Sequence, residues 1–261
     1  MIVDADGCPL WVEVEGPARA PVLMLSNSLG TDLHMWDAQI AAFAQRFRVV
    51  RYDRRGHGKS GVPGGPYTME RLGRDALAIA DGLGLAKFDW CGLSMGGMVG
   101  MWLAAHAPQR IGRLILSSTC CHYPDPSYWN ERIAAVAASG GLASLADLIV
   151  ALWFSPQFRA SSPQAVAPLR AMLAATRVEG YIACCAAIRD MDHRDILPRI
   201  RAPTLVIAGR LDRATPVAAA QFIHNRIPGA ELTILDAAHN ANAEQPIAYA
   251  QAVLGFLAPN G

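Results

Sequence analysis

Ser94 lies in the heptapeptide CGLSMGG, residues 91–97, where a glycine stands two positions before the serine and another two positions after it. A serine hydroxyl becomes an effective nucleophile only when a nearby base takes its proton. The Gly-x-Ser-x-Gly spacing is typical of a sharp strand-to-helix turn that exposes the serine oxygen, and the small flanking residues prevent clashes in that strained turn. The motif therefore predicts a nucleophile at Ser94. An ordinary glycine-rich turn without chemistry is the alternative, and the partners of the serine decide between the two.

A base and a carboxylate that could orient it occur later in the chain. His239 follows the apolar run ELTILD, and Asp212 lies three residues beyond Gly209, after the run TLVIAG. Both positions are expected in loops at the carboxyl ends of strands, the sheet edge at which open α/β folds bind ligands. His239 is therefore predicted to be the base, and Asp212 the acid that holds its tautomer and stabilises the imidazolium. Asp236 is a second candidate acid, but it is better interpreted as a loop cap that ends its own strand.

Two backbone N–H groups are expected to stabilise the oxyanion of a tetrahedral intermediate. One belongs to the residue after the nucleophile, here Met95, and the other to a loop that follows an early strand. That loop is SNSLGTDLHMW, in which Leu29 is the expected donor. Ser28 either adds a hydroxyl to the site or is only a small residue in a tight loop.

Short apolar runs alternate with helical patterns over most of the chain, which indicates a parallel sheet with helices on both faces. The run at 10–16 alternates apolar and polar residues, as an edge strand does. The predicted strands are 10–16, 21–28, 46–53, 86–93, 112–118, 202–209 and 230–236, and the predicted helices are 69–85, 95–111, 216–226 and 246–257.

The alternation stops between residues 120 and 194. This segment is rich in alanine, has a helical pattern, contains no convincing strand, and is expected to be broken into pieces by prolines at 124, 126, 156, 163 and 168. We therefore predict an α/β fold with a mostly parallel sheet flanked by helices. Its core comprises residues 1–119 and 195–261, and residues 120–194 form an inserted helical cap.

Composition excludes several function classes. The chain has 261 residues, of which 52% are hydrophobic and 17% charged, and a net charge of +1. It can form a large core, and it lacks the basic footprint that nucleic acid or an anionic membrane would require. The start of the sequence resembles no signal peptide and no run is long enough to span a membrane, so we expect a cytoplasmic protein. Six cysteines, two adjacent pairs among them, match neither a disulfide framework nor a zinc pattern, so reduced thiols and no metal site are expected.

With these parts assigned, the chain resembles the α/β-hydrolase superfamily over its whole length. YDRRGHGKSG, residues 52–61, resembles the Asp-x-Arg-Gly-x-Gly-x-Ser loop of the superfamily, which we interpret as structural, with Asp53 as an anchor. More specific are LSNSLGTDLHMWDAQ (25–39), GLSMGGMVGMWLAAHAPQRI (92–111) and ACCAAIRDMDHR (183–194), which together look like 3-oxoadipate enol-lactonases.

The resemblance implies a serine hydrolase that opens 3-oxoadipate enol-lactone to 3-oxoadipate in the β-ketoadipate pathway of aromatic catabolism. It places the family's triad on Ser94, Asp212 and His239 and the oxyanion donors on Leu29 and Met95. No cofactor is implied, and the expected partner is a small lactone that carries a carboxylate. A carboxylesterase, a cofactor-free haloperoxidase or perhydrolase and a carbon–carbon hydrolase would share the triad. A non-catalytic ligand-binding receptor of the same fold is a more remote alternative.

The substrate carboxylate requires a cation or several hydrogen-bond donors. In YWNERIAAV, Trp129 and Arg132 are three residues apart, on one face if the segment is helical. They are candidates to pack against the lactone ring and to pair with the carboxylate, although an ordinary packed tryptophan and a surface arginine remain an alternative. Trp153 lines the pocket or belongs to the core of the cap. The cap also offers other arginines, namely Arg159, Arg170, Arg177 and Arg189. The sequence leaves the oligomeric state open.

Overall fold

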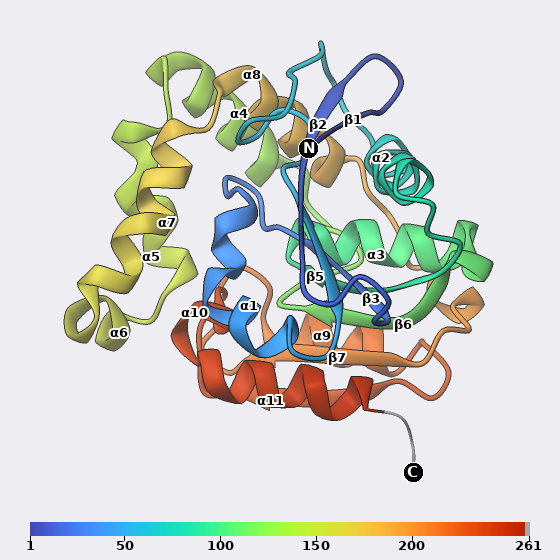
Figure 1. The fold of residues 1–261 in the computed structure, drawn as a ribbon. Helices are drawn as coiled ribbons and strands as arrows, with labels where there is room; N and C mark the ends of the chain where they lie inside the picture. The colour runs from blue at the N-terminus through green and yellow to red at the C-terminus, as the bar shows by residue number, and fades with distance from the viewer. Residues whose placement is uncertain (259–261) are drawn as a thin grey trace.

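The computed structural model describes residues 1–258, and an eight-stranded sheet forms its centre (Figure 1). The strands lie in the order β1-β2-β4-β3-β5-β6-β7-β8; β1 and β2 run antiparallel to their neighbours, and the other pairs are parallel. The strands are β1 (Ile2–Asp4), β2 (Pro9–Glu15), β3 (Val22–Ser26), β4 (Arg48–Tyr52), β5 (Phe88–Leu93), β6 (Ile111–Ser117), β7 (Thr204–Gly209) and β8 (Glu231–Leu235). The predicted fold class is confirmed.

Helices cover both faces of the sheet, and this explains why the central strands are largely apolar. All six residues of β7 are buried. Helices α1 and α11 pack together on one face, and α2 and α3 pack together on the opposite face (Figure 1). The helices are α1 (Asp37–Phe43), α2 (Met69–Gly82), α3 (Met95–His106), α4 (Ser127–Ser139), α5 (Ala146–Trp153), α6 (Pro156–Ser161), α7 (Pro163–Ala175), α8 (Val178–Arg189), α9 (Val217–His224), α10 (Ala241–Glu244) and α11 (Pro246–Leu257).

The amino-terminal end of the sheet differs from the sequence expectation. Strand β2 was expected at the edge, but it pairs with β4 on one side and with β1 on the other. The edge strand is β1, whose three residues are too few to show an alternating pattern. Helix α1 was also not predicted, because its seven residues follow a 3-10 turn and extend over barely two helical turns.

Helices α4 to α8 lie between β6 and β7 and extend over one end of the sheet, above the loops that follow the strands (Figure 1). The segments that precede α4 and follow α8 lie side by side. His122 and Asp192 form an antiparallel bridge there, and the His193 N–H donates to the Cys121 carbonyl at 2.8 Å. Pro126, Pro156 and Pro163 lie at helix starts, as expected of helix breakers. The expectation for Pro168 was wrong: it lies inside α7 and does not divide that helix.

All six cysteines are buried free thiols. Within residues 1–258, no single helix has both the length and the apolar character needed to cross a membrane. Helices α7 and α8, which are joined at a sharp bend, meet these two criteria only when they are taken together.

Candidate active site

Ser94 occupies the turn between β5 and α3 with φ 55° and ψ −114°, a backbone conformation that residues with side chains rarely adopt. The turn is possible because two glycines allow very close approaches. A Cβ on Gly92 would lie 2.1 Å from the carbonyl oxygen of Gly96, and a Cβ on Gly96 would lie 2.1 Å from the carbonyl oxygen of Ser26. The strained turn therefore holds Ser94 at the carboxyl end of β5, directly before the amino terminus of α3.

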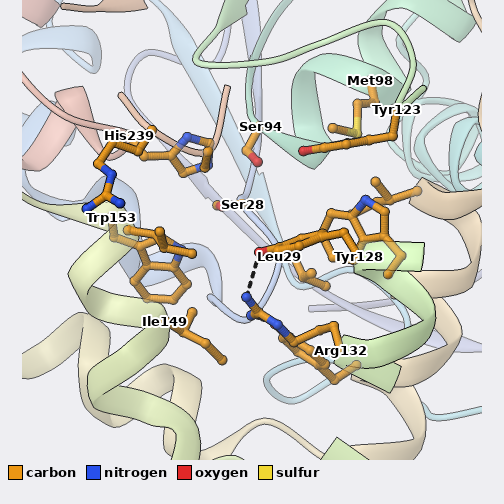
Figure 2. Close-up of a pocket in the computed structure, with 16 residues that line it drawn as sticks. Ser28, Leu29, Ser94, Met98, Tyr123, Tyr128, Arg132, Ile149, Trp153 and His239 are labelled. Atoms are coloured by element: carbon orange, nitrogen blue, oxygen red, sulfur yellow. Dashed lines mark hydrogen bonds between the residues drawn. The ribbon is translucent and has the colours of Figure 1, made fainter. Parts of the chain in front are cut away.

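His239 and Asp212 come together from the loops after β8 and β7. The Nδ1 atom of His239 lies 2.8 Å from Oδ2 of Asp212. Asp212 also accepts hydrogen bonds from the Thr215 hydroxyl at 2.7 Å and from the N–H groups of Thr215 and Ala214. Burial opposes ionisation of Asp212, but the charge of His239 and these hydrogen bonds outweigh it and hold the pKa of the carboxyl below its usual value. With Nδ1 engaged by the carboxylate, Nε2 is the nitrogen left to serve Ser94, whose side chain lies beside the imidazole (Figure 2).

Two backbone N–H groups near the Ser94 hydroxyl remain available to an oxyanion. The Ser28 N–H points to Met35 Sδ at 3.1 Å, the Gly30 N–H donates to His57 Nε2 at 3.0 Å, and the Gly96 N–H donates to the Asn27 carbonyl at 3.1 Å. The N–H group of Leu29, between Ser28 and Gly30, and that of Met95, directly before Gly96, have no acceptor among residues 1–258. This pattern is what an oxyanion hole requires.

Asp53 fixes the position of the loop that carries Leu29. Its two carboxylate oxygens accept hydrogen bonds from the N–H groups of Leu33 and Lys59, each at 2.8 Å. One carboxylate therefore joins the loop after β3 to the loop after β4, at a distance from the serine. The structural interpretation of Asp53 is consistent with this geometry.

Ser94 and His239 line a pocket of about 260 Å³ between the core and the cap (Figure 2). The predicted residues Ser28, Leu29, Trp129, Arg132 and Trp153 also line it. Met95 is not among the lining residues, and its side chain is fully buried, so a role in the site is left to its backbone N–H. The cap therefore contributes tryptophan side chains and one cation to the same pocket as the serine.

Arg132 extends from α4 into this pocket. Its Nη1 donates to the Tyr181 hydroxyl at 3.2 Å, and its Nη2 donates to the Tyr128 hydroxyl at 2.6 Å. Neither tyrosine was predicted. Tyr128 precedes Arg132 by four residues on the same helix, a spacing that could have indicated the contact. Tyr181 comes from α8, and no local pattern in the sequence connects the two residues.

The other arginines of the cap lie elsewhere. Arg170 pairs with Asp147 at 2.6 Å, Arg189 pairs with Asp190 at 2.7 Å, and Arg177 donates to the carbonyl of Ser60. Arg159 lines a separate pocket behind Asp212. Of these five cap arginines, only Arg132 therefore lines the pocket of Ser94. No group of three His, Cys, Asp or Glu side chains within residues 1–258 is arranged to hold a metal ion.

Comparison with known proteins gives consistent matches. A profile of the α/β hydrolase fold matches residues 21–246. The chain is 42% identical to 3-oxoadipate enol-lactonase 2 of Acinetobacter baylyi over 91% of this chain and 89% of that protein. The crystal structure of the enol-lactonase from Burkholderia xenovorans superposes with a TM-score of 0.96 at 39% identity, covering 98% of this chain and 99% of that one. The crystal structure of a hydrolase from Pseudomonas aeruginosa also has a TM-score of 0.96, at 46% identity, covering 99% and 98% of the two chains.

Proposed function

The chain belongs to the α/β-hydrolase fold family and, within it, to the 3-oxoadipate enol-lactonases, and from this premise we propose that it opens 3-oxoadipate enol-lactone at Ser94. The observation that carries the proposal is the shared pocket. One cavity is lined by Ser94 in its strained turn, by the imidazole of His239, which Asp212 holds at 2.8 Å, and by the cation Arg132. This arrangement suits an anionic ester.

In the proposed first step, Ser94 Oγ attacks the ring carbonyl carbon while His239 Nε2 takes the hydroxyl proton. Asp212 holds the Nδ1 proton of the imidazole and stabilises the positive charge that develops. The N–H groups of Leu29 and Met95 stabilise the negative charge on the carbonyl oxygen. Each such donor is typically worth about 3 to 4 kcal/mol in the transition state.

The tetrahedral intermediate then collapses with cleavage of the carbonyl carbon to ring oxygen bond. The leaving group is an enol oxygen, which departs more easily than a simple alkoxide and accepts the proton from His239. The free enol becomes the ketone when its carbon gains a proton and its hydroxyl loses one. A water molecule, deprotonated by His239, then attacks the acyl-enzyme and releases 3-oxoadipate with Ser94 in its original state. No step of this sequence requires a cofactor.

The carboxylate of the substrate is proposed to bind Arg132. Two of the five N–H groups of this guanidinium are used by Tyr128 and Tyr181, which hold it in place and leave the others for a ligand. Trp129 lines the same pocket, and its indole N–H is buried and has no acceptor among residues 1–258, so it is a second candidate donor. Trp153 on α5 packs the opposite wall, and its carbonyl accepts from the Asn240 N–H at 2.9 Å, next to His239.

The test is a comparison of kcat/KM for three reactions of the purified protein: hydrolysis of 3-oxoadipate enol-lactone, hydrolysis of p-nitrophenyl acetate, and perhydrolysis of acetate with peroxide. The proposal predicts that the lactone is preferred by about 10 to 150-fold or more, because it alone carries a carboxylate apart from its reacting carbonyl, which Arg132 can bind. Equal or greater activity on the ester would support the carboxylesterase alternative, and efficient perhydrolysis would support the haloperoxidase alternative. Failure of Ser94 to react with a fluorophosphonate would support a non-catalytic receptor.

The proposed substrate is a metabolite of aromatic catabolism, and a cytoplasmic location remains part of this proposal. The buried free thiols support it, because reduced cysteines persist in the cytoplasm.

A further inference from the structure

Arg54 is a buried cation in the loop after β4. The residue is only 3% exposed, and its Nη2 donates to the carbonyl oxygen of Asn27. Its Nη1 is buried and has no hydrogen-bond partner among residues 1–258. A buried guanidinium with an unsatisfied nitrogen is costly for a fold, so its presence requires an explanation.

No carboxylate within residues 1–258 forms an ion pair with Arg54. The next residue, Arg55, is paired with the buried Asp75, whereas Arg54 forms no ion pair within the described part of the chain. Burial lowers the pKa of Arg54, and the groups that counteract this are Cys184, Tyr52 and Asp53. Burial raises the pKa of Cys184 and of Tyr52 to about 12, so both stay uncharged. The carboxylate of Asp53 is occupied by two backbone N–H groups, as described above, and offsets the cation only from a distance.

The position of Arg54 relative to the candidate oxyanion hole follows from the carbonyl that it binds. The Asn27 carbonyl accepts from Arg54 on one side and from the Gly96 N–H, at 3.1 Å, on the other. Asn27 precedes Leu29 by two residues, and Gly96 directly follows Met95. The guanidinium therefore lies directly behind the two segments that supply the candidate oxyanion donors.

Arg54 also affects His57, which binds the loop that carries Leu29. Burial and the charge of Arg54 lower the pKa of His57 to about 3, so the imidazole stays neutral. A neutral imidazole can accept a hydrogen bond at Nε2, and the Gly30 N–H donates to it at 3.0 Å. This bond fixes the peptide that follows Leu29.

We propose that Arg54 is a positioning residue of the oxyanion hole, which holds the Asn27 carbonyl between the segments that carry Leu29 and Met95, and whose uncompensated charge stabilises the developing oxyanion through space. In a dry interior a fixed charge acts over a longer range than in water, and it requires no reorganisation during the reaction. The inference deepens the proposed function, since it depends on acyl transfer at Ser94, but it does not depend on the lactone being the substrate.

The first test compares Arg54→Met with Arg54→Lys, using p-nitrophenyl acetate and thermal unfolding. Loss of a direct oxyanion donor costs about 10² to 10³-fold in kcat, so loss of a charge behind the donors is expected to cost about tenfold, with KM changed less than twofold. The methionine variant should unfold at the same or a higher temperature, because a buried unpaired charge has been removed. The lysine variant should retain most of kcat. A fall in kcat together with a fall in melting temperature would mean a purely structural role and would overturn the proposal.

A second pair of variants keeps Arg54 in place and changes only the charge beside it. Cys184→Asp adds a carboxylate next to the guanidinium, and Cys184→Asn is its neutral control of equal size. The proposal predicts that kcat for the aspartate variant is about tenfold below that of the asparagine variant, and that inhibition by butylboronic acid, which forms a tetrahedral anion on Ser94, weakens by a similar factor. Equal values for the two variants would overturn the proposal. If the wild-type protein cleaves no ester at all, the proposed function fails instead.

Discussion

Replacing Arg132 with glutamine removes the one cap cation in the pocket of Ser94, and the structure sets the size of the expected effect. The guanidinium donates to Tyr128 and Tyr181 and retains free N–H groups for a carboxylate. A hydrogen bond to a charged group contributes about 1.5 to 3 kcal/mol. Since about 1.4 kcal/mol corresponds to a factor of ten, the variant should lose about 10 to 150-fold in kcat/KM for the anionic lactone. Its activity on uncharged p-nitrophenyl acetate should change less than about threefold.

The assay for this prediction measures both substrates side by side for the wild type, Arg132→Gln and Arg170→Gln. Arg170 is the matched control, because it lies in the same cap but pairs with Asp147 on the surface. The ratio of the two kcat/KM values should fall only for Arg132→Gln. An equal loss on both substrates would indicate damage to the pocket as a whole, and an unchanged ratio would refute carboxylate recognition by this residue.

Three further predictions concern the acid, the nucleophile turn and the buried His57. Asp212→Asn should lower kcat about 10⁴-fold through loss of the imidazole tautomer, with an unchanged circular dichroism spectrum. Gly96→Ala should lower the free energy of unfolding by about 1 to 3 kcal/mol in urea denaturation, because its Cβ would meet the Ser26 carbonyl at 2.1 Å, whereas Gly64→Ala, with nothing within 4 Å, should change it little. His57 protonates near pH 6.5 when unfolded and at about 3 when folded, so its pKa difference makes the free energy of unfolding decrease as the pH falls from 6.5 towards 3. His57→Gln should flatten that slope; an unchanged slope would contradict the assignment.

The core of the fold was predictable from the sequence because its strands are long, apolar and separated by periodic helices. The seven expected strands all occur, and α11 begins and ends where the pattern placed it. The errors lie where local signals are weak. Three residues of β1 cannot show a period, and the role of Pro168 inside α7 depends on packing that the sequence does not reveal.

The site residues that follow strands were predictable from the sequence, whereas those that depend on tertiary contacts were not. Ser94, Asp212 and His239 follow strands of a parallel sheet, and the carboxyl ends of such strands meet at one edge, so topology brings them together. The hydroxyl of Tyr181 reaches Arg132, and the guanidinium of Arg54 reaches the Asn27 carbonyl, through tertiary contacts that no sequence spacing indicates. For the same reason, the sequence could list the arginines of the cap but could not select Arg132.

The most direct measurement is the turnover of 3-oxoadipate enol-lactone, followed by the loss of its ultraviolet absorbance, for the wild type and for Ser94→Ala. The account predicts rapid hydrolysis by the wild type and a loss of at least about 10⁴-fold in the variant, because the acyl-enzyme cannot form. Lactone hydrolysis that persists in Ser94→Ala would contradict the nucleophile. Absence of lactone hydrolysis in a wild-type protein that still cleaves p-nitrophenyl acetate would contradict the substrate.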